Sequence, residues 1–242
     1  MKLLAMDSSG LVASVAVITE DTLLAEYTVN YKKTHSQTLL PMLDEIVRMV
    51  ELDLNEIDAI VVSSGPGSFT GLRIGSATAK GIGLALHKPI VTIPTLDGMA
   101  FQLFGTDKLI CPMIDARREQ VYTGLFGFSD DEFQVIKAQC ALSVAEILDE
   151  INQRKREVIF LGDGVDVYRN LIINKITVPY SFAPSFLNRQ RAGAVGALGI
   201  RYFKENKIQT ADEHEPIYLR LSQAERERAE KQAEKEQEIT KC

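Results

Sequence analysis

The residues best suited to chemistry by type and spacing form a glycine-rich stretch from Gly65 to Gly75, GPGSFTGLRIG, where a predicted strand passes into a predicted helix. A glycine-rich turn that opens a helix presents free backbone N–H groups, which suit phosphates and other anions. However, no Gly-Lys-Ser/Thr follows at the spacing of a Walker A loop, and Thr70 stands where a dinucleotide-binding fingerprint has its third glycine. Neither standard nucleotide motif is therefore present.

Two aspartates end predicted strands at equivalent places in the chain. Asp7 and Ser8 close the first strand, and Asp115 and Arg117 close the first strand of a similar second half. Actin-like ATPases hold Mg²⁺ and phosphates at these places, so the four residues are candidates for a nucleotide cleft, with the turn 162–164 over it. A structural role stays open, because aspartate commonly ends a strand before a turn.

Histidine and cysteine patterns point away from metal chemistry. The three histidines are isolated, with no H-x-x-x-H or H-E-x-x-H spacing, and the three cysteines form no C-x-x-C pair. No Ser/His/Asp set stands out. A zinc module, a histidine-based catalytic metal site and a disulfide framework are not predicted, and the cysteine usage fits a reducing cytoplasm.

Composition and charge restrict the class of protein. The 242 residues are 45% hydrophobic and 25% charged, which is typical of one large or two compact globular domains. The net charge of −6 lacks the basic excess of a stand-alone nucleic-acid binder. No stretch is apolar for long enough to predict a membrane span, and the polar residues at 7–10 interrupt a signal-peptide pattern.

The elements that would position these residues follow from hydrophobic periodicity. In the first half, strands are predicted at 2–6, 13–18, 23–31, 58–64 and 89–95, with helices from the N-cap Ser36 to about Leu52, from 68–71 to about 86, and up to 101. In the second half, strands are predicted at 109–114, 121–128, 132–139, 158–162 and, less regularly, 177–178, with helices at 144–151, 167–174 and 193–204. Two copies of βββαβα predict an α/β fold of the actin-like, ribonuclease-H-like (ASKHA) class.

This pattern suggests a division of the chain. We expect an N-terminal lobe at 1–104 that carries partner-binding helices and is completed by the helix at 190–206, a C-terminal lobe at 105–189, and a closing segment at 207–221. The tail at 222–242 has six glutamates and five lysines or arginines. It is predicted to be solvated and partly helical, with a partner-binding helix as the alternative.

Two helices of the first half have unusual faces. The helix after Gly65 is filled with small residues in the sets Gly71/Gly75 and Ala77/Gly81/Ala85, and each interior glycine costs about 1 kcal/mol relative to alanine. Close approach of another helix would compensate this cost. The helix before it has a wide apolar stripe that indicates contact with both its own core and a partner. Deep burial of both helices within this chain is the alternative.

The motifs at 3–9 (LLAMDSS), 35–41 (HSQTLLP), 65–75, 114–122 (IDARREQVY) and 216–220 (PIYLR) carry a resemblance. The chain resembles the bacterial TsaB (YeaZ) family, which takes part in making threonylcarbamoyladenosine in tRNA. The resemblance covers most of residues 1–221. It implies an actin-like fold without the active site of the paralogue TsaD, the metal-dependent transferase whose H-x-x-x-H pair is absent here.

The resemblance also implies partners. A TsaD-type paralogue would pack on the two helices, a TsaE-type ATPase would dock on that heterodimer, tRNA would be reached through the complex, and the isolated chain would form a homodimer through the same surface. No cofactor is expected in the isolated chain, while ATP or ADP and metal are expected at the partner subunits. The expected interface residues are Leu39, Leu43, Ile46, Gly65, Pro66, Gly67, Ser68, Phe69, Thr70, Gly71, Arg73 and Gly75.

We therefore expect a non-catalytic scaffold subunit required for threonylcarbamoyladenosine formation next to the tRNA anticodon. The alternative is an actin-like ATP-binding kinase or ATPase that uses Asp7 and Asp115. A metallopeptidase, an old label of the family, lacks its ligands in this sequence. With a net charge of −6, any direct contact with tRNA would need a local patch such as Arg117–Arg118 or Arg189–Arg191.

Overall fold

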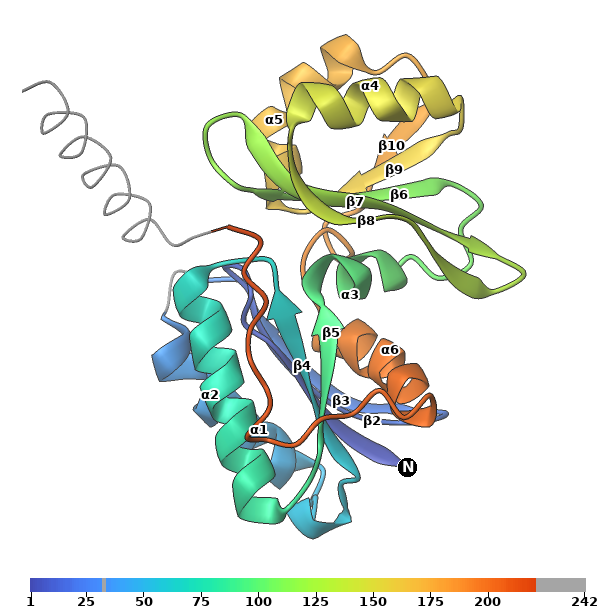
Figure 1. Cartoon of the computed structure of the whole chain (residues 1–242). Coiled ribbons are helices and arrows are strands. Elements are labelled where there is room, and N and C mark those ends of the chain that lie inside the picture. The colour runs from blue at the N-terminus through green and yellow to red at the C-terminus, as the bar shows by residue number, and fades with distance from the viewer. Residues whose placement is uncertain (32–33, 221–242) are drawn as a thin grey trace, which may run out of the picture.

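The chain is built on two five-stranded mixed sheets, one above the other in Figure 1. The computed structural model describes residues 1–31 and 34–220, so the predicted tail at 222–242 lies outside the described residues. The first sheet has the order β3-β2-β1-β4-β5 and the second has the order β10-β9-β6-β7-β8. The repeated order confirms the predicted actin-like duplication.

The first half contains β1 (Lys2–Asp7), β2 (Ala13–Thr19), β3 (Leu23–Val29), α1 (His35–Met49), a short 3₁₀ turn (Leu54–Glu56), β4 (Ala59–Gly65), α2 (Phe69–Leu86), β5 (Ile90–Pro94) and α3 (Thr95–Phe101). The second half contains β6 (Leu109–Asp115), β7 (Gln120–Ser129), β8 (Glu132–Ser143), α4 (Val144–Arg154), β9 (Val158–Leu161), α5 (Asp163–Lys175), β10 (Tyr180–Phe182) and α6 (Ala192–Lys204).

The central strands of the first sheet are buried on both faces, which explains their nearly continuous apolar sequence. Side chains alternate along β1, so Leu4 and Met6 pack with α1 and α2 while Leu3 and Ala5 pack with α6 on the opposite face. The sheet therefore lies between two helical layers, and α1 and α2 form the outer layer on one side (Figure 1).

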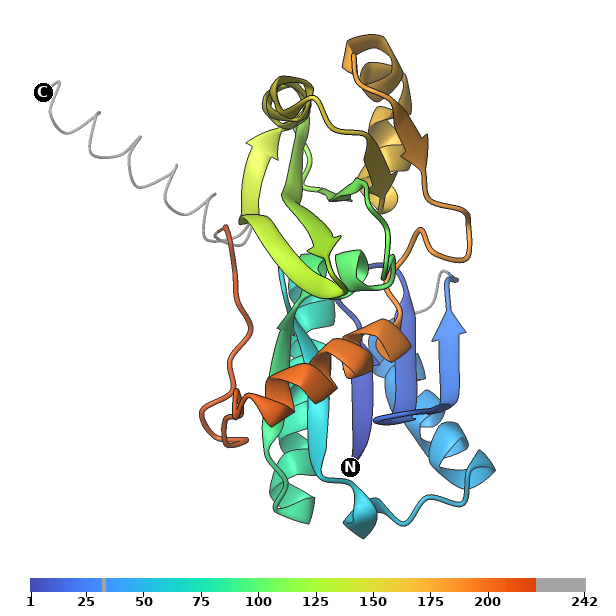
Figure 2. The same ribbon diagram turned by 90° about the vertical axis from the view of Figure 1, so that its right-hand side faces the viewer.

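The last helix of each half contacts the other half. Helix α6 follows β10 but packs across β1 and β2 of the first sheet, as Figure 2 shows. Helix α3 follows β5 and contributes Leu96 and Met99 to a core with Ile110 and Phe126 of the second sheet. Helices α3 and α6 also touch each other, so the two halves share one continuous packed region.

Two predicted local features differ from the structure. The predicted strand at 177–178 does not form, because the Thr177 N–H donates to Asn152 Oδ1 (2.8 Å), and pairing with β9 starts at Tyr180. The expected turn at 162–164 is the start of α5, whose first turn carries Asp163 and Asp166. These carboxylates interact favourably with the partial positive charge at the N-terminus of the helix and so stabilise its start.

Helix α1 also differs from its prediction at both ends. Its N-cap is Thr34, and the Ser36 hydroxyl does not cap it but donates to Thr34 Oγ1 at 3.4 Å. The helix ends at Met49 rather than near Leu52, because Glu51 adopts a left-handed backbone with φ of 49°.

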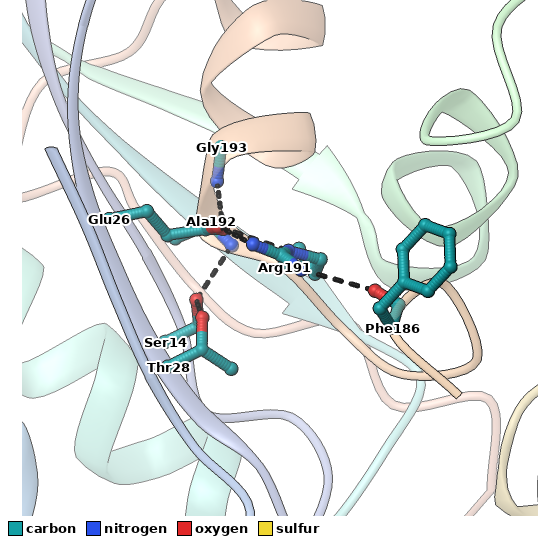
Figure 3. A network of polar contacts seen from close by, with 7 residues as sticks. All are labelled: Ser14, Glu26, Thr28, Phe186, Arg191, Ala192 and Gly193. Atoms are coloured by element: carbon teal, nitrogen blue, oxygen red, sulfur yellow. Dashed lines mark hydrogen bonds and ion pairs between the residues drawn. The ribbon is translucent and has the colours of Figure 1, made fainter. Parts of the chain in front are cut away.

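A buried carboxylate secures the return of the chain to the first sheet (Figure 3). Glu26 of β3, with 6% of its side chain exposed, pairs with Arg191 and accepts the Gly193 N–H at 2.9 Å. Ser14 of β2 accepts the Ala192 N–H at 2.8 Å. Because Arg191 offers no side-chain cap of its own, these two sheet residues satisfy the first N–H groups of α6.

Replacing Glu26 by alanine should lower the free energy of unfolding by about 2 kcal/mol, because the substitution leaves Arg191 without its ion-pair partner and removes a helix cap. Urea unfolding monitored by circular dichroism measures this loss. Glu20→Ala is the matched control, since Glu20 also pairs with α6, through Lys204, but on the surface. It should change stability little. Equal effects of the two substitutions would contradict the proposed role of Glu26.

Candidate functional site

The turn that follows β1 packs directly onto the glycine-rich stretch. A Cβ atom at Gly67 would lie 2.1 Å from the Ser9 carbonyl oxygen, and one at Gly71 would lie 2.1 Å from the Ser8 carbonyl oxygen. The Ser68 N–H donates to the Ser9 carbonyl (2.6 Å), and the Ser8 hydroxyl donates to the Gly71 carbonyl (2.9 Å). These glycines are thus required by contacts inside the chain.

The same holds for Gly75, whose Cβ would lie 2.4 Å from Ser8 Oγ. Gly71 and Gly75 are both buried, and their nearest neighbours are in the chain's own β1 turn, with the His35 ring at the start of α1 also close to Gly71. The pair therefore packs inside this chain, contrary to the packing expected from the sequence. The other small residues behave differently. Ala77, Gly81 and Ala85 are exposed, and nothing lies within 4 Å of a Cβ built on Gly81.

Asp7 is held within the first half by three hydrogen bonds. Its Oδ1 accepts from the backbone N–H (2.8 Å) and hydroxyl (2.6 Å) of Ser9, and its Oδ2 accepts from the Ser63 hydroxyl (2.5 Å). Only 1% of the residue is exposed, and burial raises the pKa of its carboxyl group, while the serine hydrogen bonds lower it. This carboxylate joins β1 to β4 and has no open face for a metal ion.

Asp115 lies in a separate cluster at the end of β6. Its Oδ1 accepts from the Arg117 N–H (2.9 Å) and the Tyr168 hydroxyl (3.0 Å), and its own N–H donates to Asp163 Oδ1 (3.2 Å). Burial raises the pKa of the Asp163 carboxyl group. Among the described residues, no hydrogen bond or ion pair joins Asp7 or Ser8 to Asp115 or Arg117.

The side chains expected to meet a partner on α1 lie in the chain's own core. Leu39, Leu43 and Ile46 are 1%, 4% and 3% exposed and pack with β1, β2 and β4. Two other apolar side chains of α1 are exposed on different sides of the helix: Leu40, 58% exposed, and Met49, 69% exposed, which lines a groove with Met42 beside β3. Helix α2 turns outward Arg73, Ala77, Gly81, Leu84 and Ala85. We call these α2 residues, together with Leu40, the outer face.

The glycine-rich turn itself is divided between the interior and the surface. Gly65 and Pro66 are buried and Gly67 is half-buried, while Ser68 and Thr70 are exposed. Ser68 caps α2 by accepting the Gly71 N–H at 3.3 Å. These residues anchor the start of α2, and its exposed first turn borders the outer face.

Residues after α6 form a strap, defined here as 207–220, that runs along α2 toward the second half (Figure 1). Gln209 bridges to Ile90 of β5, and Lys80 of α2 donates to the carbonyls of Asp212 (3.2 Å) and His214 (3.1 Å). The Ile217 N–H donates to the Ser64 carbonyl at 2.7 Å. The strap therefore holds α2 against the sheet edge.

The end of the strap covers the glycine-rich turn. Tyr218 stacks on Phe69 with ring centroids 4.6 Å apart, and the Arg73 guanidinium lies 4.0 Å from the Phe69 centroid. Arg220 donates to the Ala116 carbonyl at 3.2 Å and to Gln120. The strap thus links the start of α2 to the turn between β6 and β7.

Comparison with known proteins agrees with this architecture. The family model described as TsaD, tRNA N6-adenosine threonylcarbamoyltransferase, matches residues 22–228. The chain is 32% identical over 225 residues to the tRNA threonylcarbamoyladenosine biosynthesis protein TsaB of Bacillus subtilis, covering 93% of this chain and 96% of that protein. It is 31% identical over 236 residues to TsaB of Haemophilus influenzae, covering 91% and 94%.

The chain belongs to the TsaB family. Membership connects it with the biosynthesis of threonylcarbamoyladenosine in tRNA and confirms the resemblance carried by the sequence motifs. The fold agrees with YeaZ from Pseudomonas aeruginosa, which superimposes with a TM-score of 0.73 at 24% identity, covering 90% of this chain and 99% of that structure. None of the described helices is both long and apolar enough to span a membrane.

Sequence reasoning missed two parts of this TsaB-family site. The broad apolar stripe of α1 includes Leu40 and Met49, but periodicity does not show that these two side chains are exposed while Leu39 and Leu43 are buried. The strap contacts of Lys80 and Tyr218 had no comparable signal, because they join segments far apart in the sequence.

Matched alanine substitutions in α2 test the two sets of small residues. Gly75→Ala should lower the free energy of unfolding by about 1–3 kcal/mol, because its Cβ meets Ser8. Gly81→Ala should raise it by about 0.5–1 kcal/mol, because the site is open and alanine favours a helix. Denaturant titration compares them, and a stable Gly75→Ala variant would refute the close packing on Ser8.

The strap should weaken in acid. His214 is 1% exposed and accepts a hydrogen bond from Gln209, and burial together with nearby Lys80 lowers its pKa from 6.5 to about 4. Because the unfolded chain binds this proton more readily, the stabilisation is present above pH 6.5 and is lost as pH falls toward 4. We expect a loss of about 2 kcal/mol.

Urea unfolding at several pH values measures this loss against a His214→Gln variant, which cannot titrate at that position. The stability difference between parent and variant should shrink or reverse as the pH is lowered. A difference that stays constant from pH 7 to pH 4 would show that His214 does not contribute.

Proposed function

We propose that the chain is a non-catalytic subunit that binds a TsaD-type transferase through the outer face and holds it in an active arrangement for threonylcarbamoyladenosine formation in tRNA. The observation that carries the proposal is the outward face of α2, where exposed Leu84 lies on the same side as the small residues Ala77, Gly81 and Ala85, with exposed Leu40 on the neighbouring helix α1. Family membership supports the reaction in which the complex takes part.

The chemistry of the outer face fits helix-on-helix packing. Ala77, Gly81 and Ala85 lie on successive turns of α2 and allow another helix backbone to approach closely. Exposed Leu84 of α2 and Leu40 of the neighbouring α1 add apolar area that would be removed from water. A paralogue with the same fold would offer an equivalent helix pair, so a near-symmetric bundle could form, and a second copy of this chain could occupy the same surface.

Asp7 supports a non-catalytic role. The carboxylate that an actin-like ATPase would direct toward Mg²⁺ is buried here and bonded to Ser9 and Ser63. The Gln190 side chain packs against the turn that follows β1, since a Cβ atom on Gly10 would lie 2.6 Å from Gln190 Nε2. We place ATP or ADP, and the catalytic metal, on the TsaD-type and TsaE-type partners, with the whole assembly in the cytoplasm.

A charged substitution on the outer face tests the interface. Ala77→Arg should weaken binding to the TsaD-type partner by at least about a hundredfold, because it places a long cation where two helices would meet. Copurification and isothermal titration calorimetry measure this. Asn170→Arg, on the exposed side of α5, is the matched control and should bind normally.

Reconstitution tests the role itself. Modification of an unmodified tRNA transcript by the TsaD-type and TsaE-type partners should need this chain and should fall sharply with Ala77→Arg. Full modification in its absence would overturn the proposed function, and normal binding by Ala77→Arg would overturn only the interface.

A further inference from the structure

Two arginine pairs stand out in the sequence of this acidic chain, and the structure separates them. Arg189 pairs with Asp166, and Arg191 pairs with Glu26 (Figure 3), so both cations of the second pair are engaged inside the chain. Arg117 and Arg118 are exposed. Arg117 has 88% of its side chain exposed and makes a single 3.4 Å ion pair with Asp115, and Arg118 has no ion pair among the described residues.

The turn between β6 and β7 holds these two arginines in an unusual backbone. Arg117, Arg118 and Glu119 have φ values of 65°, 54° and 57°, three consecutive left-handed residues without a glycine. Each such residue costs about 1–2 kcal/mol. The Ala116 N–H to Gln120 carbonyl bond (2.9 Å) and the Val144 N–H to Glu119 carbonyl bond (3.1 Å) maintain the conformation. Strain of this kind marks functional turns more often than plain connections.

The strap supports the same turn from below. Arg220 donates to the Ala116 carbonyl and to Gln120, so it fixes the base of the turn. Two positions earlier, Tyr218 is 40% exposed and is backed by Phe69 at 4.6 Å. The Tyr218 ring is therefore supported on one side and exposed, and Arg220, two residues later, joins its segment to the turn that carries the two outward arginines.

We propose that this site, made of Arg117, Arg118 and Tyr218 and called here the arginine turn, binds the phosphodiester backbone of tRNA directly, with Tyr218 stacking on a base or ribose. The proposal rests on the proposed function, which brings tRNA to the complex. The arginine guanidinium groups can donate two hydrogen bonds each to phosphate oxygens, and an aromatic ring can stack on any base. The site would therefore bind RNA without sequence specificity. An acidic protein segment would use the arginines but not the exposed ring.

Arg117 and Arg118 lie between β6 and β7 in the second half, whereas Ala77 and the other outward residues of the outer face lie on helices of the first half. Substitutions of these two arginines should therefore leave binding of the TsaD-type partner unchanged. Arg117→Asn/Arg118→Asn removes both charges while keeping a residue type that tolerates the left-handed backbone. The matched control, Lys155→Asn/Lys175→Gln, removes two exposed cations near the C-terminal ends of α4 and α5, whereas the turn contacts the start of α4.

The experiment measures affinity of the assembled complex for an unmodified tRNA transcript by fluorescence anisotropy at several salt concentrations. The double asparagine variant should bind about tenfold more weakly and lower the slope of log affinity against log salt by about 1.5, as two lost phosphate contacts require. Arg117→Lys/Arg118→Lys should keep most of the slope. Tyr218→Ser should weaken binding several-fold with no change of slope.

Several results would overturn the proposal. An asparagine variant with the parent affinity and slope, or a control variant with the same loss, would exclude a specific contact at the arginine turn. Loss of the TsaE-type partner with unchanged tRNA affinity would assign the turn to a protein. All of these leave the proposed function intact, which fails separately if tRNA modification proceeds without this chain.

Discussion

The close packing of the turn after β1 against the start of α2 determines how this helix lies on the sheet. The carbonyl oxygens of Ser8 and Ser9 occupy the space that side chains at Gly71 and Gly67 would need, and the Ser8 hydroxyl does the same at Gly75. This contact fixes the direction of α2, fills the space between the β1 turn and the helix, and leaves the opposite side of the helix outside. One packing requirement therefore both closes the first turn of α2 onto β1 and presents a surface of small residues.

Much of the fold was predictable because hydrophobic periodicity depends on local geometry. The strands near Leu4 and Ile60, and the helix that begins at Phe69, were placed within a residue or two. The failures arise where distant groups decide. The Thr177 N–H donates to the Asn152 side chain and is not available for strand pairing. Nothing in residues 177–178 themselves indicates this partner 25 positions earlier in the chain.

The site was harder to predict than the fold for a related reason. Glycine at 75 and glycine at 81 look alike in sequence, yet one meets Ser8 and the other meets nothing within 4 Å. A broad apolar stripe on α1 likewise does not reveal that Leu39 faces the core and Leu40 faces outward until the sheet is in place. Family motifs identified the important segments. Only tertiary packing distinguishes the buried residues that support this surface from the exposed residues that a partner can contact.

The two halves are joined in ways that suit a rigid support. Ser14 of β2 and Glu26 of β3 bind the start of α6 and so hold this helix on the first sheet. Helix α3 packs into the core of the second sheet, and the strap joins α2 to the β6–β7 turn through Arg220. An ATPase of this fold needs its halves to move around a nucleotide, whereas a subunit that positions a partner gains from fixed geometry. The same contacts connect the two proposed surfaces through packed segments of one chain, so a transferase bound at the outer face and a tRNA bound at the arginine turn would be joined by this subunit.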